Sequence, residues 1–273
     1  MGEILIGTSG YSYKDWIGPF YPPGLPERRM LEFYARRFPF TEVNATYYRL
    51  PAARTFESMA RRVPPGFLFA VKGYRGLTHE RSEASEREAR LFREALEPLR
   101  AGGRLGAVLL QFPYAFRNRE EERAWLGRLR RWLDGLPLVA EFRHEGWFRP
   151  ATYAWLRELG VGLVCVDAPR LPGLPPPVAE RTAPVAYVRF HGRNASRWWS
   201  HEEAYERYDY LYRTAELEEW VPRLRALAAG EGRLLVAFNN HYQGQAVVNA
   251  RMLARLLGVE PAGEGPPEGE PPR

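Results

Sequence analysis

The sequence predicts an α/β fold, a single (β/α)8 barrel of the TIM type. Eight short segments rich in Val, Leu, Ile and Phe recur roughly every 33 residues, with amphipathic stretches between them. The chain also lacks the glycine-rich fingerprint of a dinucleotide-binding sheet, because Gly7 and Gly10 lead into an aromatic loop and not into a helix. A closed barrel is therefore favoured over an open, doubly wound sheet.

The eight apolar segments have the composition of parallel strands that are buried on both faces. We expect strands at Glu3–Ser9, Thr41–Tyr47, Phe67–Gly73, Leu105–Phe112, Leu138–Arg143, Gly162–Asp167, Ala186–His191 and Leu234–Asn239.

The stretches between them repeat their charged residues with helical spacing. We expect helices at Glu27–Phe38, Arg54–Arg62, Glu83–Arg100, Glu120–Leu133, Tyr153–Leu159, Thr214–Ala229 and Gln245–Leu257. The connection after the sixth strand, Pro169–Pro184, is rich in proline, so its helix is expected to be short or missing.

The length of 273 residues fits one large domain or two small ones, because hydrophobic cores tend to divide beyond roughly 250–300 residues. We assign residues 1–258 to the barrel. Residues 259–273 are mostly Pro, Gly and Glu, a composition that buries too little apolar surface to offset the entropy of ordering. That segment is predicted to be a flexible tail.

The net charge is +6, and 39 residues are lysine or arginine. Lysine occurs only at Lys14 and Lys72, so arginine is the default cation of this chain. The positive balance favours an anionic ligand over a cationic one. No apolar run approaches the roughly 18 residues that span a bilayer, and residues 1–10 are interpreted as a strand and not as a leader. We therefore expect a cytoplasmic protein with no membrane partner.

Side chains of a barrel strand point alternately to the helix layer and to the interior. One set of alternate positions is apolar throughout and is expected to face the helices. That set is Val43, Phe69, Val71, Val108, Leu110, Ala140, Phe142, Val164, Val166, Val188, Phe190, Val236 and Phe238.

The opposite set ends in a polar residue in all eight segments. These residues are Ser9, Asn44, Lys72, Gln111, Arg143, Asp167, His191 and Asn239. Each stands at the carboxyl end of its strand, where the loops of barrel enzymes form the active site. The pattern predicts that the eight side chains meet in one cup at the mouth of the barrel.

One step deeper, the same alternation places Glu42, Glu141 and Arg189 inside the barrel, where charges must be paired. In one interpretation, Arg189 neutralises the glutamates in a buried ion cluster that orients the mouth. In the other, burial and mutual repulsion separate the two glutamate pKa values, so that one glutamate serves as acid and the other as base. The sequence leaves both interpretations open.

Four of the five histidines follow strand ends, which raises the question of a metal. A divalent cation could be held by Glu141, His144, Asp167 and His191, but no compact signature such as His-Glu-x-x-His occurs. We predict no metal site, and the cofactor stays unknown. Cys165 has the inward parity of its strand and is expected to be a core residue and not a nucleophile.

Two loops are rich in aromatic side chains. The loop after the first strand carries Tyr11, Tyr13, Trp16, Phe20 and Tyr21, and the loop after the seventh carries Trp198, Trp199, Tyr205 and Tyr208 beside Arg193 and Arg197. Aromatic planes next to guanidinium groups suit sugars or bases that carry phosphate. The alternative is that these rings only cap the barrel mouth and pack the loops.

Several blocks of residues occur together in a fixed order. They include Gly7-Thr8-Ser9-Gly10-Tyr11, Glu42-Val43-Asn44, Phe69-Ala70-Val71-Lys72, Glu141-Phe142-Arg143-His144, Tyr187-Val188-Arg189-Phe190-His191-Gly192 and Phe238-Asn239-Asn240. In these blocks the chain resembles the YecE-like family, also called domain of unknown function 72, over roughly residues 3–257. The resemblance implies a TIM barrel related to sugar-phosphate isomerases and to endonuclease IV-type barrels, and it implies no activity. The chain lacks the dense histidine and carboxylate ligands that the zinc site of endonuclease IV needs.

We expect an enzyme, an isomerase or hydrolase, that acts at the barrel mouth on a phosphorylated sugar or nucleotide-like compound. The expected catalytic residues are Glu42, Glu141, Asp167 and His191. The expected substrate-binding residues are Ser9, Tyr11, Trp16, Asn44, Lys72, Gln111, Arg143, His144, Arg189, Asn239 and Asn240. Of these, Lys72, Arg143 and Arg189 would hold the anion. The alternative is a nucleic-acid-binding or DNA-repair-associated protein that uses the arginine and aromatic loops.

Overall fold

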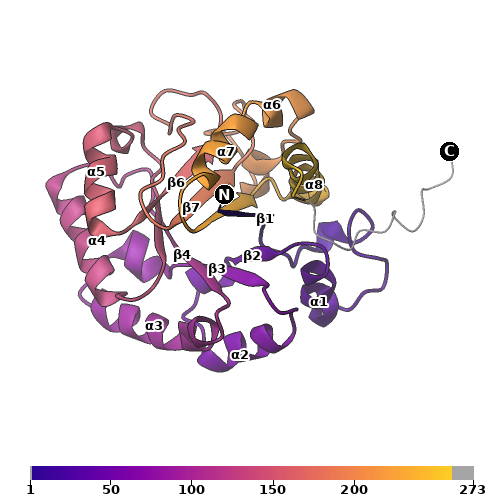
Figure 1. Cartoon of the computed structure of the whole chain (residues 1–273), viewed down its shortest axis with the longest axis horizontal. Coiled ribbons are helices and arrows are strands. Elements are labelled where there is room, and N and C mark those ends of the chain that lie inside the picture. Colours follow the sequence, from indigo (N-terminus) through magenta and orange to yellow (C-terminus); the bar gives the residue numbers. More distant parts are fainter. Residues whose placement is uncertain (1, 260–273) are drawn as a thin grey trace.

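The computed structural model describes residues 2–259 and contains a closed barrel of eight parallel strands in sequence order. The strands are β1 (Glu3–Ser9), β2 (Phe40–Val43), β3 (Leu68–Lys72), β4 (Leu105–Gln111), β5 (Leu138–Glu141), β6 (Gly162–Asp167), β7 (Val185–Phe190) and β8 (Arg233–Phe238). Figure 1 shows the strands at the centre of the molecule and the helices around them. The predicted TIM-type barrel is confirmed. The predicted tail lies, apart from Val259, outside the described residues.

The helices that surround the barrel follow the predicted order along the chain. They are α1 (Met30–Ala35), α2 (Ala53–Arg61), α3 (Ser85–Ala101), α4 (Glu120–Trp132), α5 (Pro150–Leu159), α6 (Thr214–Glu218), α7 (Val221–Ala228) and α8 (Gln245–Leu257). The structure differs from the prediction at Thr214–Ala229, which forms two helices, because Pro222 fits only the start of the second. The connection between β6 and β7 contains no helix, as its prolines predict.

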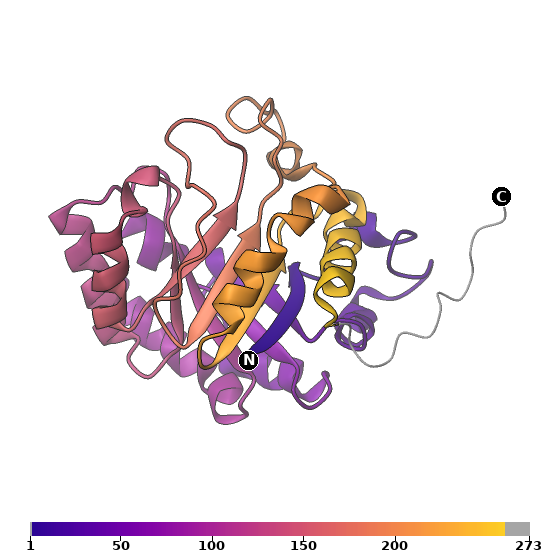
Figure 2. The ribbon, with the colours of Figure 1, turned by 45° about the horizontal axis from the view of Figure 1, so that its top comes forward.

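Short turns of helix follow most strands on the carboxyl side of the barrel. They are η1 (Lys14–Trp16), η3 (Ala45–Tyr47), η4 (Gly76–Glu80), η5 (Glu145–Trp147), η6 (Ala204–Tyr208) and η7 (Tyr242–Gly244). Figure 2 shows the long loops after β6 and β7 rising beyond the ends of their strands. These turns and loops form the mouth of the barrel and hold side chains over it.

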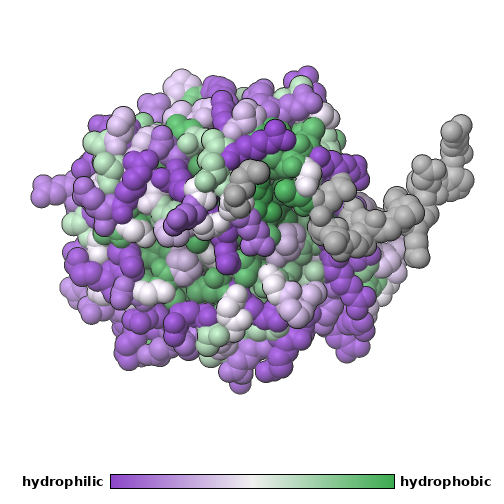
Figure 3. Space-filling view, viewed as in Figure 1, coloured by the Kyte–Doolittle hydropathy of each residue, from purple (hydrophilic) through white to green (hydrophobic). Residues whose placement is uncertain are grey.

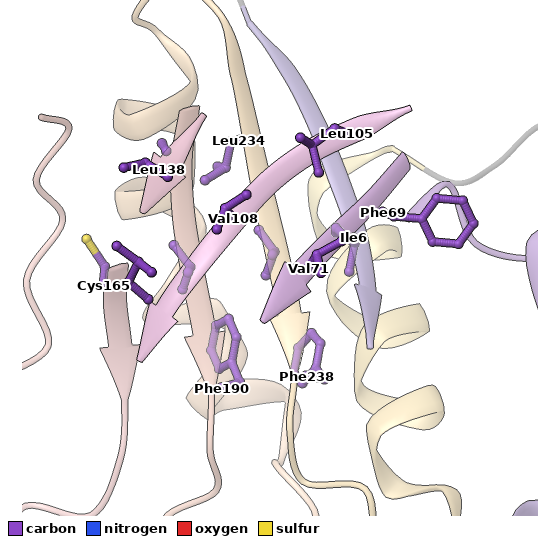
Figure 4. Packing of buried hydrophobic residues seen from close by; sticks show 14 of the residues in the cluster. Ile6, Phe69, Val71, Leu105, Val108, Leu138, Cys165, Phe190, Leu234 and Phe238 are labelled. Atoms are coloured by element: carbon purple, nitrogen blue, oxygen red, sulfur yellow. The ribbon is translucent and has the colours of Figure 1, made fainter. Parts of the chain in front are cut away.

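The main apolar core lies between the barrel wall and the helices. Its strand residues include Ile6, Val71, Val108, Phe190 and Phe238, all buried, and Figure 4 shows these side chains on neighbouring strands. On the face in Figure 3, hydrophilic side chains cover most of the helical rim, and hydrophobic ones gather beside α8. The helices therefore turn their apolar sides toward the barrel, as their sequence pattern predicts. No helix within the described residues is long and apolar enough to cross a membrane.

A second, smaller apolar cluster fills the inside of the barrel. It consists of Leu5, Phe40, Leu68, Ala70, Ala107, Leu109, Val139, Val164, Val166, Tyr187, Leu235 and Ala237. This layer closes the barrel and leaves no room for polar groups at its floor. Its upper members lie level with polar side chains, because Ala70 and Leu109 pair in register with Glu42 and Lys72, and Val166 pairs with Arg189. The polar inward-facing residues lie toward the carboxyl ends of the strands.

The predicted alternation holds on seven strands and is wrong on β6. Val164 and Val166 face the interior and not the helices, and their register partners on β7 are the inward-facing Tyr187 and Arg189. Asp167 pairs in register with the outward-facing Phe190 and so lies on the helix side. Every residue of β6 is buried, so its sequence gives no hydrophobic alternation from which to choose the face.

Cys165 shares the outward face of β6 and not the predicted inward one. It is fully buried in the main core, and burial raises the pKa of its thiol to about 12. The prediction that Cys165 is a core residue fits this environment, because a buried thiol of raised pKa is a poor nucleophile.

Candidate active site

Arg189, on β7, is almost fully buried at the centre of the polar layer and bridges two carboxylates. Its Nε and Nη2 donate to Glu42 at 3.0 and 2.7 Å, and its Nη1 donates to Glu141 at 2.6 Å. Nη1 also lies 3.4 Å from Oε1 of Gln111 on β4. Both glutamates are fully buried. The three charged side chains that the alternation placed inside the barrel therefore form one ion cluster.

The Glu42 carboxylate accepts four hydrogen bonds. Two come from Arg189, one comes from the Tyr187 hydroxyl at 2.9 Å, and one comes from the Ser9 hydroxyl. Ser9 Oγ in turn accepts from Arg189 at 2.9 Å and from Nδ2 of Asn44 at 3.1 Å. Because a carboxylate has about four acceptor positions, Glu42 is saturated and acts by holding Arg189 in place.

Glu141 has a second arginine, which stands closer to the mouth. Its Oε1 lies 2.6 Å from Nε of Arg143 and 3.2 Å from Nε2 of His191. Burial alone would raise the pKa of Glu141, but Arg143 and Arg189 hold that pKa well below its usual value. Glu141 is therefore ionised, and the interpretation in which a raised pKa makes it a proton donor does not fit it. We call Glu42, Glu141, Arg143, Arg189 and His191 the inner cluster.

His191, the first residue after β7, is buried and uncharged at neutral pH. Burial, together with the nearby Arg143, lowers the pKa of His191 to about 4. Its Nδ1 accepts a hydrogen bond from Nδ2 of Asn239 at 3.1 Å, so the ring proton is on Nε2 and faces Glu141. His191 is thus a neutral imidazole with a fixed tautomer next to an ionised carboxylate.

Lys72, the last residue of β3, is half-buried and has a different environment from the arginines. Its Nζ lies 4.7 Å from the centre of the Tyr47 ring. Burial lowers the pKa of Lys72 to about 8, and the positive charges of Arg189 and Arg143 contribute to this shift. Within residues 2–259 its ammonium group forms no ion pair with a carboxylate. Lys72 is thus a cation at the mouth that interacts with Glu42 and Glu141 only at a distance.

Two loop residues at the mouth have shifted pKa values, one beside Lys72 and one beside His191. The ring of His79, in η4, packs edge-on against Tyr47, and burial together with the Lys72 charge lowers the pKa of His79 to about 4. Tyr208, at the end of η6, lies with its ring centre 6.2 Å from that of His191. Burial raises the pKa of Tyr208, but Arg143 and other arginines outweigh burial and bring it below the usual value. Tyr208 is therefore the tyrosine that most readily gives up its proton beside the inner cluster.

A cleft of about 560 Å³ opens next to the mouth, between the loops that follow β1 and β2. Its inner end is formed by Glu42 and Asn44, and the Oδ1 of Asn44 is buried without a partner among the described residues. Its outer part is lined by Tyr11, Arg49, Leu50, Arg54, Phe56 and Met59. The volume is typical of small-molecule sites, and the mixed lining suits a ligand with an apolar part and an anionic part.

Asp167 belongs to a second buried group on the helix side of the wall. Its carboxylate accepts from Nε and Nη2 of Arg193 at 2.9 and 2.8 Å, from the Tyr212 hydroxyl at 2.7 Å and from Nε1 of Trp220 at 2.7 Å. We call these four residues the outer cluster. The prediction that Asp167 shares the cup at the mouth is wrong, because β6 presents this residue to the helices.

Three other predicted site residues make contacts outside the inner cluster. Trp16 is fully buried, and its Nε1 donates to the His241 carbonyl at 2.7 Å. His144 accepts from the Gly146 amide at 3.0 Å in the loop after β5. Trp16 is therefore not exposed to a ligand, and His144 caps a turn.

Asn240 is also fully buried, and its Nδ2 donates to the Tyr210 carbonyl and to Oδ1 of Asn249, each at 2.8 Å. It connects the loop after β8 to the loop after β7 and to α8. The predicted substrate-binding role of Asn240 therefore has no geometric support, whereas Asn239, one residue earlier, contacts His191.

No group of three or more histidine, cysteine, aspartate or glutamate side chains suited to a metal is found within residues 2–259. The metal alternative needed Glu141, His144, Asp167 and His191 to come together, and Asp167 and His144 have the other partners described above.

Three tyrosines that surround the inner cluster are not among the predicted site residues, although Tyr13 and Tyr208 belong to the aromatic loops that the sequence marks. Tyr187 stands two residues before Arg189, so the same alternation would have found it. Tyr13 folds back so that its hydroxyl donates to the Ser9 carbonyl at 2.6 Å, which depends on a turn at Gly10 with φ of 94°. Tyr208 comes from an irregular loop far from any strand end, and no periodic pattern marks it.

Comparison with known proteins places this barrel among close structural relatives. The family model described as "Protein of unknown function DUF72" matches residues 5–272. The UPF0759 protein YunF of Bacillus subtilis is 33% identical over 279 residues, which cover 96% of this chain and 98% of that protein.

Two solved structures show the same architecture. A DUF72 family protein from Thermotoga maritima is 38% identical with a TM-score of 0.86, covering 94% of this chain and 99% of its own. A DUF72 family protein from Enterococcus faecalis V583 is 27% identical with a TM-score of 0.85, covering 98% of this chain and 100% of its own. None of these descriptions states a substrate or a reaction.

Proposed function

The chain belongs to the DUF72 family, and we propose that it is an enzyme that binds a small phosphorylated compound, a sugar phosphate or a nucleotide-like molecule, at the carboxyl mouth of its barrel. The observation that carries this proposal is Lys72, a half-buried cation at the mouth with no carboxylate partner within the described residues.

The charge balance of the mouth supports an anionic ligand. Glu42 and Glu141 contribute two negative charges, whereas Arg189, Arg143 and Lys72 contribute three positive charges. His191 and His79 add none near neutral pH, because the pKa of each is about 4. An anion that enters the mouth restores neutrality in a region of low dielectric, where the attraction is stronger than at the surface.

Arg189 and Arg143 have different roles in the proposed site. Arg189 directs its donors at Glu42, Glu141 and Ser9, so we now assign it a positioning role in place of the predicted anion binding. Nε of Arg143 lies 2.6 Å from Glu141, and the Arg143 side chain is 12% exposed, whereas that of Arg189 is 2% exposed. We assign anion binding to Arg143 and Lys72, in keeping with the ability of guanidinium groups to hold phosphate.

His191 and Tyr208 are the groups best placed to exchange protons with a bound ligand. Glu42 is saturated and Glu141 is held ionised, whereas His191 is a neutral imidazole and Tyr208 has a lowered pKa. Their ring centres are 6.2 Å apart. Because His191 is buried with its ring nitrogens directed at Asn239 and Glu141, a ligand would contact Tyr208 first.

Thermal unfolding in inorganic phosphate tests this proposal, with chloride used to hold the ionic strength constant. Phosphate is expected to raise the unfolding temperature of the wild-type chain, since a ligand that binds only the folded state stabilises it. Lys72→Met should remove this effect, and Lys14→Met should keep it, because Lys14 is an exposed lysine of η1. Equal responses of the two variants would contradict the proposal.

The nucleic-acid alternative has less support from the aromatic loops. Trp16 and Trp198 are buried, and Tyr205 stacks on Tyr242 at 4.7 Å, so of the rings proposed for base stacking Trp199 is the most exposed. A single-stranded oligonucleotide titrated at several salt concentrations separates the two ideas. Binding that weakens steeply with salt would favour the alternative.

A further inference from the structure

Lysine is rare in this chain, and one of its two lysines is the half-buried cation at the barrel mouth. Of 39 basic residues only Lys14 and Lys72 are lysine. Arginine and lysine differ chemically in one respect that matters here. A guanidinium group stays protonated in proteins, whereas a buried lysine can lose its proton and become a nucleophile.

The surroundings of Lys72 act on its charge in opposite directions. Burial, Arg189 on β7 and Arg143 after β5 disfavour the protonated amine, whereas Glu42 and Glu141 inside the barrel favour it. The loop residues beside the amine are Tyr47 and His79. The two glutamates direct their oxygens at Arg189, Arg143 and hydroxyl groups and make no ion pair with Lys72.

Tyr47 positions the amine. Nζ of Lys72 lies over the Tyr47 ring, and the backbone carbonyl of Lys72 accepts the Thr46 hydroxyl at 2.5 Å, which fixes the end of β3 against η3. The ring attracts the protonated form of the amine, but it does so more weakly than a carboxylate in contact would. Two arginines nearby disfavour its charge, and burial lowers the pKa of Lys72 to about 8.

We propose that Lys72 is a catalytic nucleophile that forms an imine with the carbonyl group of a small phosphorylated aldehyde or ketone. This inference rests on the proposed function, because it takes the barrel mouth as the substrate site, and it names the substrate class more closely. In this arrangement Arg143 holds the phosphate. With a pKa of about 8, Lys72 is present in both forms near neutral pH, so the protonated form attracts the anion and the neutral form attacks the carbonyl carbon through Nζ.

The reaction balances without an additional reagent. The lone pair of Nζ attacks the carbonyl carbon, and the oxygen takes up a proton, which gives a carbinolamine. The carbon–oxygen bond then breaks, and the two protons that the amine has lost leave with the oxygen as water. A carbon–nitrogen double bond remains, which can withdraw electrons from the neighbouring carbon as imine-forming enzymes require.

Borohydride trapping tests this proposal on the whole chain. The protein is incubated near pH 7.5 with glycolaldehyde phosphate or with unphosphorylated glycolaldehyde, and sodium borohydride then reduces any imine to a stable secondary amine. Intact mass and peptide mapping locate the adduct. Lys72 is expected to carry about tenfold more adduct than Lys14, and the phosphate ester should label Lys72 more than glycolaldehyde does.

A chain without the nucleophile provides the control. The Lys72→Arg variant keeps a positive charge at this position and should not be labelled there. In the Lys14→Arg variant, Lys72 should be labelled to the same extent as in the wild-type chain. If Lys72→Arg does not fold, the ratio of labelling at the two lysines in the wild-type chain still decides the question.

The outcomes separate this inference from the proposed function. If phosphate protects the chain against unfolding but Lys72 is labelled no more than Lys14, the imine proposal is overturned and the anion site stands. If Lys72 is labelled equally by both aldehydes and phosphate gives no protection, the proposed function fails and the imine proposal, which needs a phosphorylated carbonyl, fails in its stated form. Preferred labelling of Lys72 by the phosphate ester supports both.

Discussion

The barrel wall separates two buried groups in which arginine meets carboxylate, and they differ in the charge that stands beside them. Carboxylates, Glu216 and Glu219, stand beside the outer cluster, and a cation, Lys72, stands beside the inner cluster. In the outer cluster, one carboxylate, Asp167, accepts four donors, and Arg193 also reaches Glu219 at 2.9 Å. In the inner cluster, two glutamates hold Arg189, while Arg143 and the nearby Lys72 stand on the side of the mouth.

This difference shows that buried charge alone is a poor marker of a functional site. The outer cluster fixes the loop after β7, since its Tyr212 hydroxyl also accepts the Gly192 amide at 2.9 Å, and every polar atom of Asp167 has a partner. The inner cluster has the same chemistry, but a cation is left over beside it and faces the mouth. The surplus charge, and not the ion pairs, is the feature that points to a ligand.

The largest expected effect comes from removing the centre of the inner cluster. Arg189→Met leaves Glu42 without a cation and Glu141 with Arg143 alone, so it should lower the free energy of unfolding by about 3–5 kcal/mol. Urea denaturation measures this loss. Adding Glu42→Gln to the variant should recover part of the stability, and a failure to recover any would mean that Arg189 acts mainly through packing.

Urea denaturation of a variant in the outer cluster should show a smaller loss in the free energy of unfolding, and phosphate binding should be unchanged. Asp167→Asn keeps the shape of the side chain but weakens its charged hydrogen bonds, which should cost about 2–3 kcal/mol. Its stabilisation by phosphate should equal that of the wild type. If phosphate no longer stabilised this variant, the outer cluster would also contribute to ligand binding, and the two clusters would not differ in function.

Acid should destabilise the inner cluster through His191. The pKa of His191 is about 4 when folded and about 6.5 when unfolded, so between these values the unfolded chain binds more protons and stability falls as the pH falls. From pH 7 to pH 5 this group alone should cost about 2 kcal/mol. His191→Asn should show a smaller loss over that range, and an identical pH dependence would show that the imidazole is freely protonated.

Lys72→Met should change stability least and in the opposite direction. The folded chain disfavours the charge of Lys72, so replacing it with an apolar side chain should raise the free energy of unfolding at pH 7 by about 1 kcal/mol, an effect limited by the partial exposure of the amine. Urea denaturation at pH 7 measures it. A clear loss of stability would mean that the Lys72 amine makes a stabilising contact in the folded chain, as Arg193 of the outer cluster does.

The barrel could be predicted from sequence because the same apolar segment pattern recurs along the chain. Eight apolar segments at a regular spacing gave the topology, and the alternation of seven of them gave the correct face. At Glu42, Glu141 and Arg189 the alternation also brought together residues that are far apart in the chain, because side chains inside a barrel have nowhere else to point.

The rest of the site could not be predicted because it depends on irregular backbone and on a fully buried strand. Asp167 was misplaced because β6 is buried on both faces and its side chains give no pattern. Tyr208 reaches His191 through a loop whose course no periodicity records. The ion pair of Glu141 with Arg143 helps to keep Glu141 ionised. It depends on a distance of 2.6 Å between the two side chains, which the order of residues does not specify.

The most direct test of the surplus cation at the mouth is nuclear magnetic resonance of the chain with labelled lysine, which gives two side-chain signals because only Lys14 and Lys72 are present. On titration with inorganic phosphate at pH 7 and constant ionic strength, the Lys72 signal should move and reach saturation, while the Lys14 signal stays in place. A Lys72 signal that does not move, or two signals that move alike, would contradict the account.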